Sequence, residues 1–370
     1  MALPVSRLLD PIKIFKKITM KKILLYLLSL GMALSCLCLS SCERQPKKYA
    51  AHTFDYFDTV TSITGYAKNE EEFSAVCADI FRMLEEYHRL YTVYERYEGM
   101  ENLRTVNELS DGTHRTVKVD ARIIDLLIYA KEMYEKTDGR TNVAMGSVLS
   151  VWHEYRERGM KDPKNASLPP YDLLENASLH TDIDRMEIDR ENGTVTLTDP
   201  AMRLDAGAIA KGYAVEMIAK ALEEKNIVGY LLNVGGNVRA VGAKPDGSPW
   251  TVGIENPDIN ASDPYAAYLR LSDESVVTSG SYQRYYNVDG KRYHHIIDPE
   301  TLFPAQGYLS VSVVCKSSAM GDALSTALFC MTYEEGLALI NATEGAEAMW
   351  IFSDGEKRCS EGFSSHMLQK

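Results

Sequence analysis

Tight-turn signals between strand-like segments constrain the fold of this chain more than any other feature. The segment MEIDRENGTVTLTD (186–199) alternates polar and apolar residues about Asn192-Gly193, a pair typical of two-residue hairpin turns. Asp-Gly pairs at 289–290 and 354–355 lie in similar settings. Such turns join antiparallel strands, so we expect a largely antiparallel sheet.

Amphipathic helices are interspersed with these hairpins. Apolar residues recur at helical spacing in 73–97, in 120–137 and again up to about Lys225. Two shorter helices are expected at 319–331 and 334–340. The predicted strands are 228–232, 250–254, 267–271, 285–288, 292–297, 309–314 and 348–352, and 160–182 reads as a loop-rich insertion. Helices mixed with antiparallel hairpins predict an α+β fold with helices flanking the sheet.

The N-terminal segment differs from the rest of the chain. Lys21 and Lys22 precede an apolar run that ends in Leu39-Ser40-Ser41-Cys42. This pattern predicts a signal peptide rather than a spanning helix. Its end is similar to the lipobox of bacterial lipoproteins, in which a cysteine, here Cys42, is lipidated and becomes the first residue. Because Met20-Lys21-Lys22 is itself a typical signal start, residues 1–19 are interpreted as an over-extended start.

These features predict three parts: a signal peptide at 1–41, a tether at 42–51 and a folded domain at 52–370. The expected location is the bacterial cell membrane, with the lipid-anchored domain facing outward. The formal net charge of −12 argues against nucleic acid as a partner. The cysteines after Cys42 lack CxxC spacing, so zinc is not expected. Whether one or two disulfides form among them is not decided by the sequence; these cysteines are Cys77, Cys315, Cys330 and Cys359.

The loop LDAGAIAKGYAVE (204–216) places glycines and a lysine before a helix. Backbone N–H groups at a helix start favour an anion such as phosphate. Lys211 precedes Gly212 and Tyr213 follows, so the Walker pattern fails, and no GxGxxG is present. The loop either holds a phosphate or is a close-packed turn of small residues, and the pattern alone does not decide.

Asp322 and Thr326, in AMGDALSTAL (319–328), are four residues apart on a predicted helix and therefore share a face. A carboxylate and a hydroxyl of this kind suit Mg²⁺. Alternatively, Asp322 is an acidic residue near the helix start that complements the helix dipole below a cap at Ser317 or Ser318.

The segment HHIIDPET (294–301) offers a candidate general base. His294 and His295 fall in a predicted strand, so their side chains point to opposite faces and one of them is expected at the surface. Neutral imidazole can accept a proton near pH 7. Asp298 then lies in a turn before Pro299. NVGGN (233–237) permits either close approach to a ligand or a tight turn.

Taken in order, LDAGAIAKGYAVE, NVGGN, TSGSYQR, HHIIDPET and GDALSTAL resemble the FAD:protein FMN transferases of the ApbE family. The similarity spans residues 52–352. It implies a single T-fold-like α/β unit with FAD in a cleft between two lobes. It also implies Mg²⁺-dependent transfer of the FMN half of FAD to a Thr or Ser hydroxyl of a target protein, with release of AMP. Membrane electron-transfer subunits with a flavinylation motif are the implied acceptors.

The resemblance assigns roles to the residues that match the family motifs. Asp205 and Lys211 would contact FAD. The Ala208 carbonyl would bind the metal together with the side chains of Asp322 and Thr326. The loop at 204–216 would therefore hold a pyrophosphate and its metal.

His295 matches the catalytic histidine of the family, with Asp298 beside it. Further FAD contacts are implied in loops around the cleft, at Phe57, Ala144, Met145, Gly146 and Ile297. The chain departs from the family pattern at three of its loops. Phe57 replaces a methionine, Asn142 and Ala144 replace Asp and Thr, and Leu302 replaces the glycine that usually follows Asp-Pro-x-Thr.

Other functions are compatible with parts of this pattern. A FAD pyrophosphatase would use the same pocket with water in place of the acceptor. A lipoprotein that only binds FAD would need neither the metal pair nor the base, so Asp322, Thr326 and His295 argue against it. A solute-binding lipoprotein would show two βαβ lobes, which the hairpin-rich second half does not.

Overall fold

The computed structural model describes residues 45–109 and 115–368, and Lys47–Lys370 forms one compact unit. The predicted signal peptide and Cys42 lie outside the described residues. In the part of the chain that is described, no helix combines the length and apolarity needed to cross a membrane.

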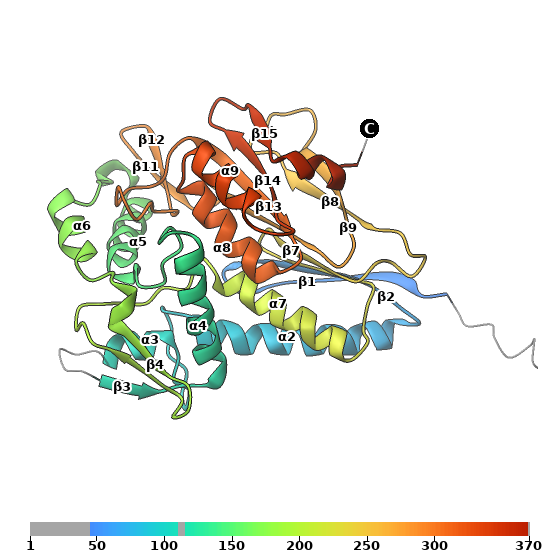
Figure 1. Ribbon diagram of the computed structural model, residues 1–370, viewed down its shortest axis with the longest axis horizontal. Helices are drawn as coiled ribbons and strands as arrows, with labels where there is room; N and C mark the ends of the chain where they lie inside the picture. Colours follow the sequence, from blue (N-terminus) through green and yellow to red (C-terminus); the bar gives the residue numbers. More distant parts are fainter. Residues whose placement is uncertain (1–44, 110–114, 369–370) are drawn as a thin grey trace, which may run out of the picture. The chain divides into compact units, whose positions relative to one another are not determined.

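An eight-stranded sheet, antiparallel throughout, forms the centre of the fold (Figure 1). In spatial order its strands are β1 (Lys47–Tyr56), β2 (Thr59–Ala67), β6 (Tyr230–Val234), β7 (Asn237–Val241), β10 (Ser275–Gly280), β13 (Tyr308–Cys315), β14 (Glu347–Phe352) and β15 (Lys357–Cys359). The expected antiparallel sheet is confirmed. Residues 47–51, expected in a tether, belong instead to β1, so the sheet begins before residue 52.

Helices cover one face of this sheet, and a hairpin covers the other. The helices are α2 (Glu70–Tyr91), α7 (Ala210–Glu224), α8 (Ser318–Phe329) and α9 (Tyr333–Asn341). The hairpin is β8 (Trp250–Glu255) with β9 (Tyr265–Leu271), next to a 3₁₀ helix at Glu361–His366. Ala348 and Trp350 of β14 pack with the helices, whereas Met349 and Ile351 pack with the hairpin. Because both faces are buried, central strands carry apolar residues on both sides.

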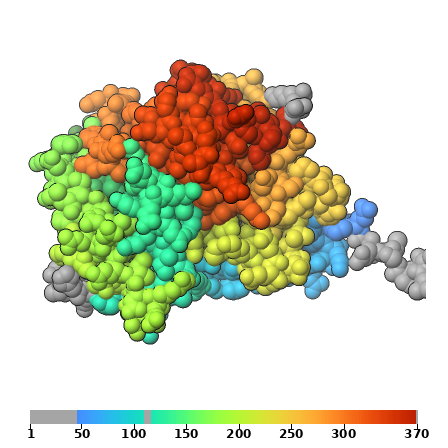
Figure 2. Space-filling model, viewed as in Figure 1, coloured from blue at the N-terminus to red at the C-terminus, as the bar shows by residue number. Residues whose placement is uncertain are grey.

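A second group of elements lies beside the sheet. It contains α3 (Leu103–Leu109), β3 (Arg115–Lys118), α4 (Ala121–Lys136), α5 (Gly146–Lys161), α6 (Tyr171–Ser178), β4 (Met186–Asp189), β5 (Thr194–Leu197), β11 (Tyr285–Val288), β12 (Lys291–His294) and short 3₁₀ turns at Pro163–Asn165 and Ile183–Arg185. Figure 2 shows α4 in teal directly beside the orange-red α8 and the yellow-green α7. Segments distant in sequence thus form one continuous core.

Several predicted elements are confirmed, and others differ. Helix α4 begins after Asp120, whose side chain accepts a hydrogen bond from the Arg122 N–H. The expected loop-rich insertion at 160–182 contains α6 and the end of α5. The strand predicted at 292–297 ends at His294. The question of disulfides is answered by four free thiols, at Cys77, Cys315, Cys330 and Cys359.

Candidate active site

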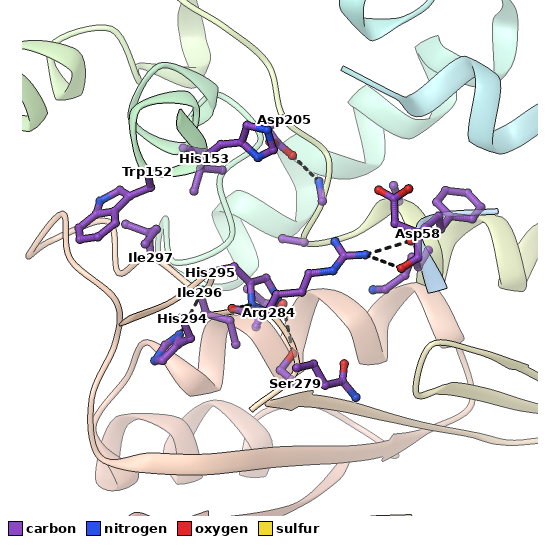
Figure 3. A pocket seen from close by; sticks show the side chains of 18 of the residues that line it. Asp58, Trp152, His153, Asp205, Ser279, Arg284, His294, His295, Ile296 and Ile297 are labelled. Carbon is purple, nitrogen blue, oxygen red and sulfur yellow. Dashed lines mark hydrogen bonds between the residues drawn. The ribbon is translucent and has the colours of Figure 1, made fainter. Parts of the chain in front are cut away.

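One cavity brings most of the predicted site residues together (Figure 3). Its walls come from the β1–β2 turn, the end of α2 and the loop after it, the α4–α5 connection, α5, the loop before α7 and the first turn of that helix, the β6–β7 turn, the end of β10 and the β10–β11 connection, the segment after β12, and the first turns of α8. The predicted residues that line it are Phe57, Met145, Asp205, Ala208, Lys211, His295, Ile297, Asp322 and Thr326. Residues from segments that are distant in sequence therefore meet at one site.

Helices α7 and α8 hold the Asp322 carboxylate in place. The Gly212 N–H donates to Asp322 Oδ2 at 2.7 Å, and Lys211 Nζ lies 3.3 Å from Oδ1. Asp322 is buried. A Cβ on Gly212 would lie 2.4 Å from Asp322 Cβ and 2.5 Å from the Ser318 carbonyl oxygen. Close packing at Gly212 is thus confirmed, whereas the phosphate interpretation of the loop stays a prediction.

Oxygen donors gather beside Asp322. Thr326 follows one turn later on α8, with its Oγ1 3.4 Å from Ser279 Oγ, and the Ala208 loop lines the same cavity. Among the described residues no group of three or more His, Cys, Asp or Glu side chains could hold a metal. A carboxylate, a hydroxyl and a carbonyl are nevertheless the ligand types that Mg²⁺ prefers, and this ion usually completes its shell with water and phosphate oxygens. The donor set therefore fits a hard divalent cation.

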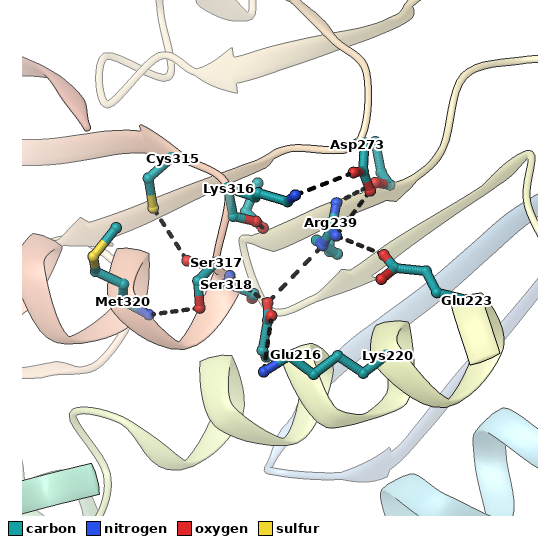
Figure 4. Close-up of polar contacts among 12 residues, drawn as sticks. Glu216, Lys220, Glu223, Arg239, Asp273, Cys315, Lys316, Ser317, Ser318 and Met320 are labelled. Atoms are coloured by element: carbon teal, nitrogen blue, oxygen red, sulfur yellow. Dashed lines mark hydrogen bonds and ion pairs between the residues drawn. The ribbon is translucent and has the colours of Figure 1, made fainter. Parts of the chain in front are cut away.

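A buried ionic cluster outside the cavity fixes how α7 packs on α8 (Figure 4). Glu216 Oε2 accepts the Ser318 N–H at 2.9 Å, one turn before Asp322. Arg239 is buried and donates to Glu223 at 2.7 Å and to Asp273 at 3.0 Å. The cap predicted at Ser317 or Ser318 is Ser317, which accepts the Met320 N–H. These contacts leave the Asp322 end of the cavity little freedom to move.

His295 is positioned by a backbone carbonyl. Its N–H donates to the Arg284 oxygen at 3.1 Å, and its ring Nδ1 lies 3.2 Å from the same oxygen. Burial, with a contribution from the positive charge of Arg284, lowers the pKa of His295 to about 3. The ring is therefore neutral near pH 7. Because a carbonyl can only accept, Nδ1 carries the proton and Nε2 is free to accept one.

The neighbouring His294 is not the surface residue that the strand pattern predicted. It is buried, its Nε2 donates to the Ala305 carbonyl oxygen at 2.8 Å, and its Nδ1 accepts the Ile296 N–H at 3.2 Å. Burial lowers the pKa of His294. His294 is thus held inside the protein, whereas His295, which follows the end of β12, lines the cavity.

Asp298, expected beside His295, is engaged elsewhere. Its carboxylate pairs with Arg140 at 3.2 Å and accepts the Glu300 N–H at 3.0 Å. The Asp298 N–H donates to the Phe303 carbonyl, which closes a tight turn. In this turn Leu302, which replaces the family's glycine, keeps a positive φ of 62°. These contacts give Asp298 a role in the turn and do not support its assignment as a partner of His295.

The remaining implied FAD contacts divide into two groups. Phe57, Met145, Asp205 and Ile297 line the cavity, and burial raises the pKa of Asp205, whose Oδ1 accepts the Gly207 N–H at 2.8 Å. Ala144 is fully buried in the main core. A Cβ on Gly146 would lie 2.5 Å from the Arg203 carbonyl oxygen. We therefore assign these last two residues to packing rather than to ligand contact.

Several cavity residues were not predicted from the sequence: Tyr94, Arg140, His153, Arg156 and Arg284. Of these, Arg284 falls inside the motif TSGSYQR, which could have indicated it. His153 and Arg156 belong to a charged stretch of α5 that resembles a solvated helix face. The Tyr94 ring packs on the His153 ring with centroids 4.8 Å apart. Aromatic faces and three arginines suit an anionic ligand that contains rings.

Fold and cavity together define an α+β protein with a cation-lined cavity that suits such a ligand. The family model described as the ApbE family matches residues 57–350. The chain belongs to the ApbE family.

Named relatives agree with this assignment. The chain is 36% identical over 260 residues to a FAD:protein FMN transferase of Treponema pallidum, covering 66% of this chain and 70% of that protein. It is 28% identical over 346 residues to one of Haemophilus influenzae, covering 90% and 94%. The crystal structure of the ApbE protein of Thermotoga maritima superposes with a TM-score of 0.74 at 27% identity, covering 87% of this chain and all of that one. The flavin transferase ApbE of Vibrio cholerae shares the fold, with a TM-score of 0.72 at 24% identity over 87% and 99%.

Proposed function

We propose that this protein is a FAD:protein FMN transferase, which moves the FMN half of FAD onto a Thr or Ser hydroxyl of a target protein and releases AMP. One observation carries the proposal. Helices α7 and α8 bring Lys211, Asp322 and Thr326 together in the same cavity as a neutral His295. A pyrophosphate substrate needs positive charge and oxygen donors at one place and a base nearby, and the names of the relatives supply the substrate.

The reaction balances with the groups that the cavity presents. The acceptor hydroxyl attacks the phosphorus on the FMN side, and the bond from that phosphorus to the bridging oxygen breaks. AMP leaves with the bridging oxygen, and a phosphoester joins FMN to the acceptor. His295 Nε2 would take the hydroxyl proton, and Lys211 Nζ would balance charge on the phosphates; the presence of both residues in the cavity supports these roles.

Asp322, Thr326 and the Ala208 carbonyl would hold Mg²⁺. Bound there, the ion would neutralise charge on the phosphoryl oxygens. Lys211 would then share the Asp322 carboxylate with the ion, because its Nζ lies 3.3 Å from Oδ1 and 3.5 Å from Oδ2.

The products distinguish this proposal from its alternatives. Residues 43–370 are mixed with FAD, Mg²⁺ and a purified acceptor domain that bears a flavinylation motif, and the acceptor mass and the AMP released are measured together. A transferase gives one FMN per acceptor with equal AMP. Free FMN with AMP and an unmodified acceptor would identify a pyrophosphatase. Intact bound FAD would leave a binding protein and would contradict the role of His295.

We further propose that the protein works on the outer side of a bacterial membrane, anchored by a lipid on Cys42. The lipobox-like sequence supports this location, as does the start of the compact unit at Lys47, a few residues downstream. Metabolic labelling with an alkyne fatty acid tests it. The expected result is a labelled membrane-bound protein and an unlabelled Cys42→Ala variant. Label retained by the variant would contradict the assignment.

A further inference from the structure

The tip of the β1–β2 hairpin forms part of the cavity wall in an unusual backbone conformation. Tyr56 pairs with Thr59, so Phe57 and Asp58 form a two-residue turn. Both have positive φ, 54° and 50°, as a type I′ turn requires. Such turns favour Asn and Gly, and a phenylalanine there is strained. Something outside the hairpin must therefore hold the tip.

Arg284 supplies that contact from the opposite wall (Figure 3). Its Nη2 donates to the carbonyl oxygens of Phe57 and Asp58, each at 3.1 Å. The side chain reaches across the cavity from the β10–β11 connection to a tip more than 200 residues away in sequence. The acceptors are the backbone carbonyls of Phe57 and Asp58 and not the Asp58 carboxylate. The contact therefore depends on the backbone conformation of the turn.

The same residue holds His295. Its carbonyl oxygen accepts both the backbone N–H and the ring Nδ1–H of His295, at 3.1 Å and 3.2 Å. Phe57, Arg284 and His295 all line the cavity. One residue thus contacts the hairpin tip through its side chain and the candidate base through its backbone.

Two further contacts hold the tip of the β1–β2 hairpin against the rest of the protein. The Phe57 N–H donates to His88 Nδ1 at 3.2 Å, and the two rings meet edge to face. Gly235 of NVGGN lies so close to Thr59 that a Cβ would be 2.4 Å from Thr59 Oγ1. These contacts define where the tip sits when it is closed, but neither of them reaches His295.

We propose that Arg284 is a positioning residue that clasps the β1–β2 tip over the cavity and couples its closure to the orientation of His295. When the tip is clasped, the Arg284 segment is fixed and His295 keeps its Nδ1–H tautomer with Nε2 free. When the tip opens, the carbonyl that orients His295 loses this support. The consequence for FAD rests on the proposed function: the tip would slow FAD release while the base is correctly placed.

Hydrogen exchange of the purified full chain without FAD tests the clasp directly. Arg284→Ala should speed exchange in residues 57–60 and at the His295 amide by about tenfold, as expected on losing charge-assisted hydrogen bonds. Arg284→Lys keeps the charge, but its Nζ ends one bond short of the Nη2 atom that makes both contacts, so exchange in this variant should be as fast as in Arg284→Ala. Arg292→Ala is the matched control, because Arg292 is exposed on β12, stacks on Tyr285 and is not part of the cavity.

The outcomes separate the clasp from the alternatives. Unchanged exchange at 57–60 in Arg284→Ala, or a wild-type rate in Arg284→Lys, would overturn the proposal, since Arg284 would then act only on a ligand or only as a charge. Unchanged exchange in β13 excludes general loosening as the cause. The ring ¹⁵N resonances of His295 should show the Nδ1–H tautomer in the wild type and a mixture in Arg284→Ala. A fixed tautomer in both would contradict the coupling.

A second readout uses the ligand. FAD should dissociate about tenfold faster from Arg284→Ala than from the wild type or Arg292→Ala, in proportion to the opening of the tip. An unchanged dissociation rate beside faster exchange would refute the gating of FAD. Failure of the wild type to bind FAD would refute the proposed function, whereas the exchange data would still decide the clasp.

Discussion

The two ends of the cavity are built in opposite ways. At the α7–α8 end Asp322 is buried, receives the Gly212 N–H and is backed by the buried Arg239 cluster. At the hairpin end the strained turn Phe57-Asp58 is held by hydrogen bonds from the exposed Arg284. Burial and many hydrogen bonds keep charged groups at fixed positions, as the α7–α8 end requires. A tip held by a few exposed hydrogen bonds can open, which allows a large ligand to enter and leave. Substitutions at the two ends should therefore differ in kind.

The largest effect is expected from Asp322→Ala. Loss of the only carboxylate in the proposed metal site should lower FMN transfer on the order of 10²–10³-fold, the range typical for removing one preorganised electrostatic group. Asp322→Asn is the control, because it retains an acceptor for the Gly212 N–H and should unfold near the wild-type temperature while remaining inactive. AMP release and thermal unfolding are the measurements. Activity in Asp322→Asn would show that the charge is not required.

Gly212→Ala should be the most destabilising single change at the rigid end. The added Cβ meets Asp322 Cβ and the Ser318 carbonyl at 2.4 and 2.5 Å, and backbone cannot yield easily, so we expect a loss of about 3 kcal/mol. Gly336→Ala on α9 is the matched helical control. Its Cβ would lie 3.1 Å from a Leu328 methyl, which can move, and helix propensity favours alanine, so a change within about 1 kcal/mol is expected. Equal effects in urea unfolding would contradict the close approach of α7 to α8.

His295 should make stability depend on pH. Its folded pKa of about 3 lies below the ordinary value of 6.5, so the unfolded chain binds the proton more readily. The stabilisation is complete above pH 6.5 and is lost as the pH falls from there toward 3. With allowance for the partly exposed ring, the wild type should lose about 1 kcal/mol more than His295→Gln between pH 7 and 5. Identical pH profiles of unfolding would mean that the folded pKa is not lowered.

The smallest effect is expected at the hairpin tip. Asp58→Gly relieves the cost of a positive φ but adds freedom to the unfolded chain, so stability should rise by about 0.5 kcal/mol. The Asp58 carbonyl remains available to Arg284, so hydrogen exchange at the tip should stay slow. A destabilised variant in thermal unfolding would mean that the Asp58 side chain has a contact of its own.

Sequence patterns predicted the parts of the fold that present one face to water. The helix predicted at 120–137 and the β4–β5 hairpin are confirmed because periodicity and turn chemistry are local properties, although the hairpin loop spans the four residues 190–193 rather than Asn192-Gly193 alone. Strands β7 and β10 were missed for a physical reason. All five residues of β7 are buried, so the strand lacks the alternation that marks a half-exposed strand.

The site shows the same division. Asp322 and Thr326 were placed correctly on one helix face by their spacing alone, and the family motifs brought Lys211 and His295 to the same cavity. Asp298 lies in the predicted turn, but its contact with Arg140, 158 residues away in sequence, could not be predicted from local patterns. The Arg284 contact with the hairpin tip was equally hidden, since it depends on a turn conformation that the sequence Phe-Asp disfavours.

A crystal structure with FAD and Mn²⁺ in place of Mg²⁺ tests the central claim most directly. The account predicts an anomalous peak at about 2.1 Å from an Asp322 carboxylate oxygen, with Thr326 Oγ1 and the Ala208 carbonyl as further ligands and the FAD pyrophosphate beside Lys211. A metal bound elsewhere, or a pyrophosphate remote from the α7–α8 end, would contradict it.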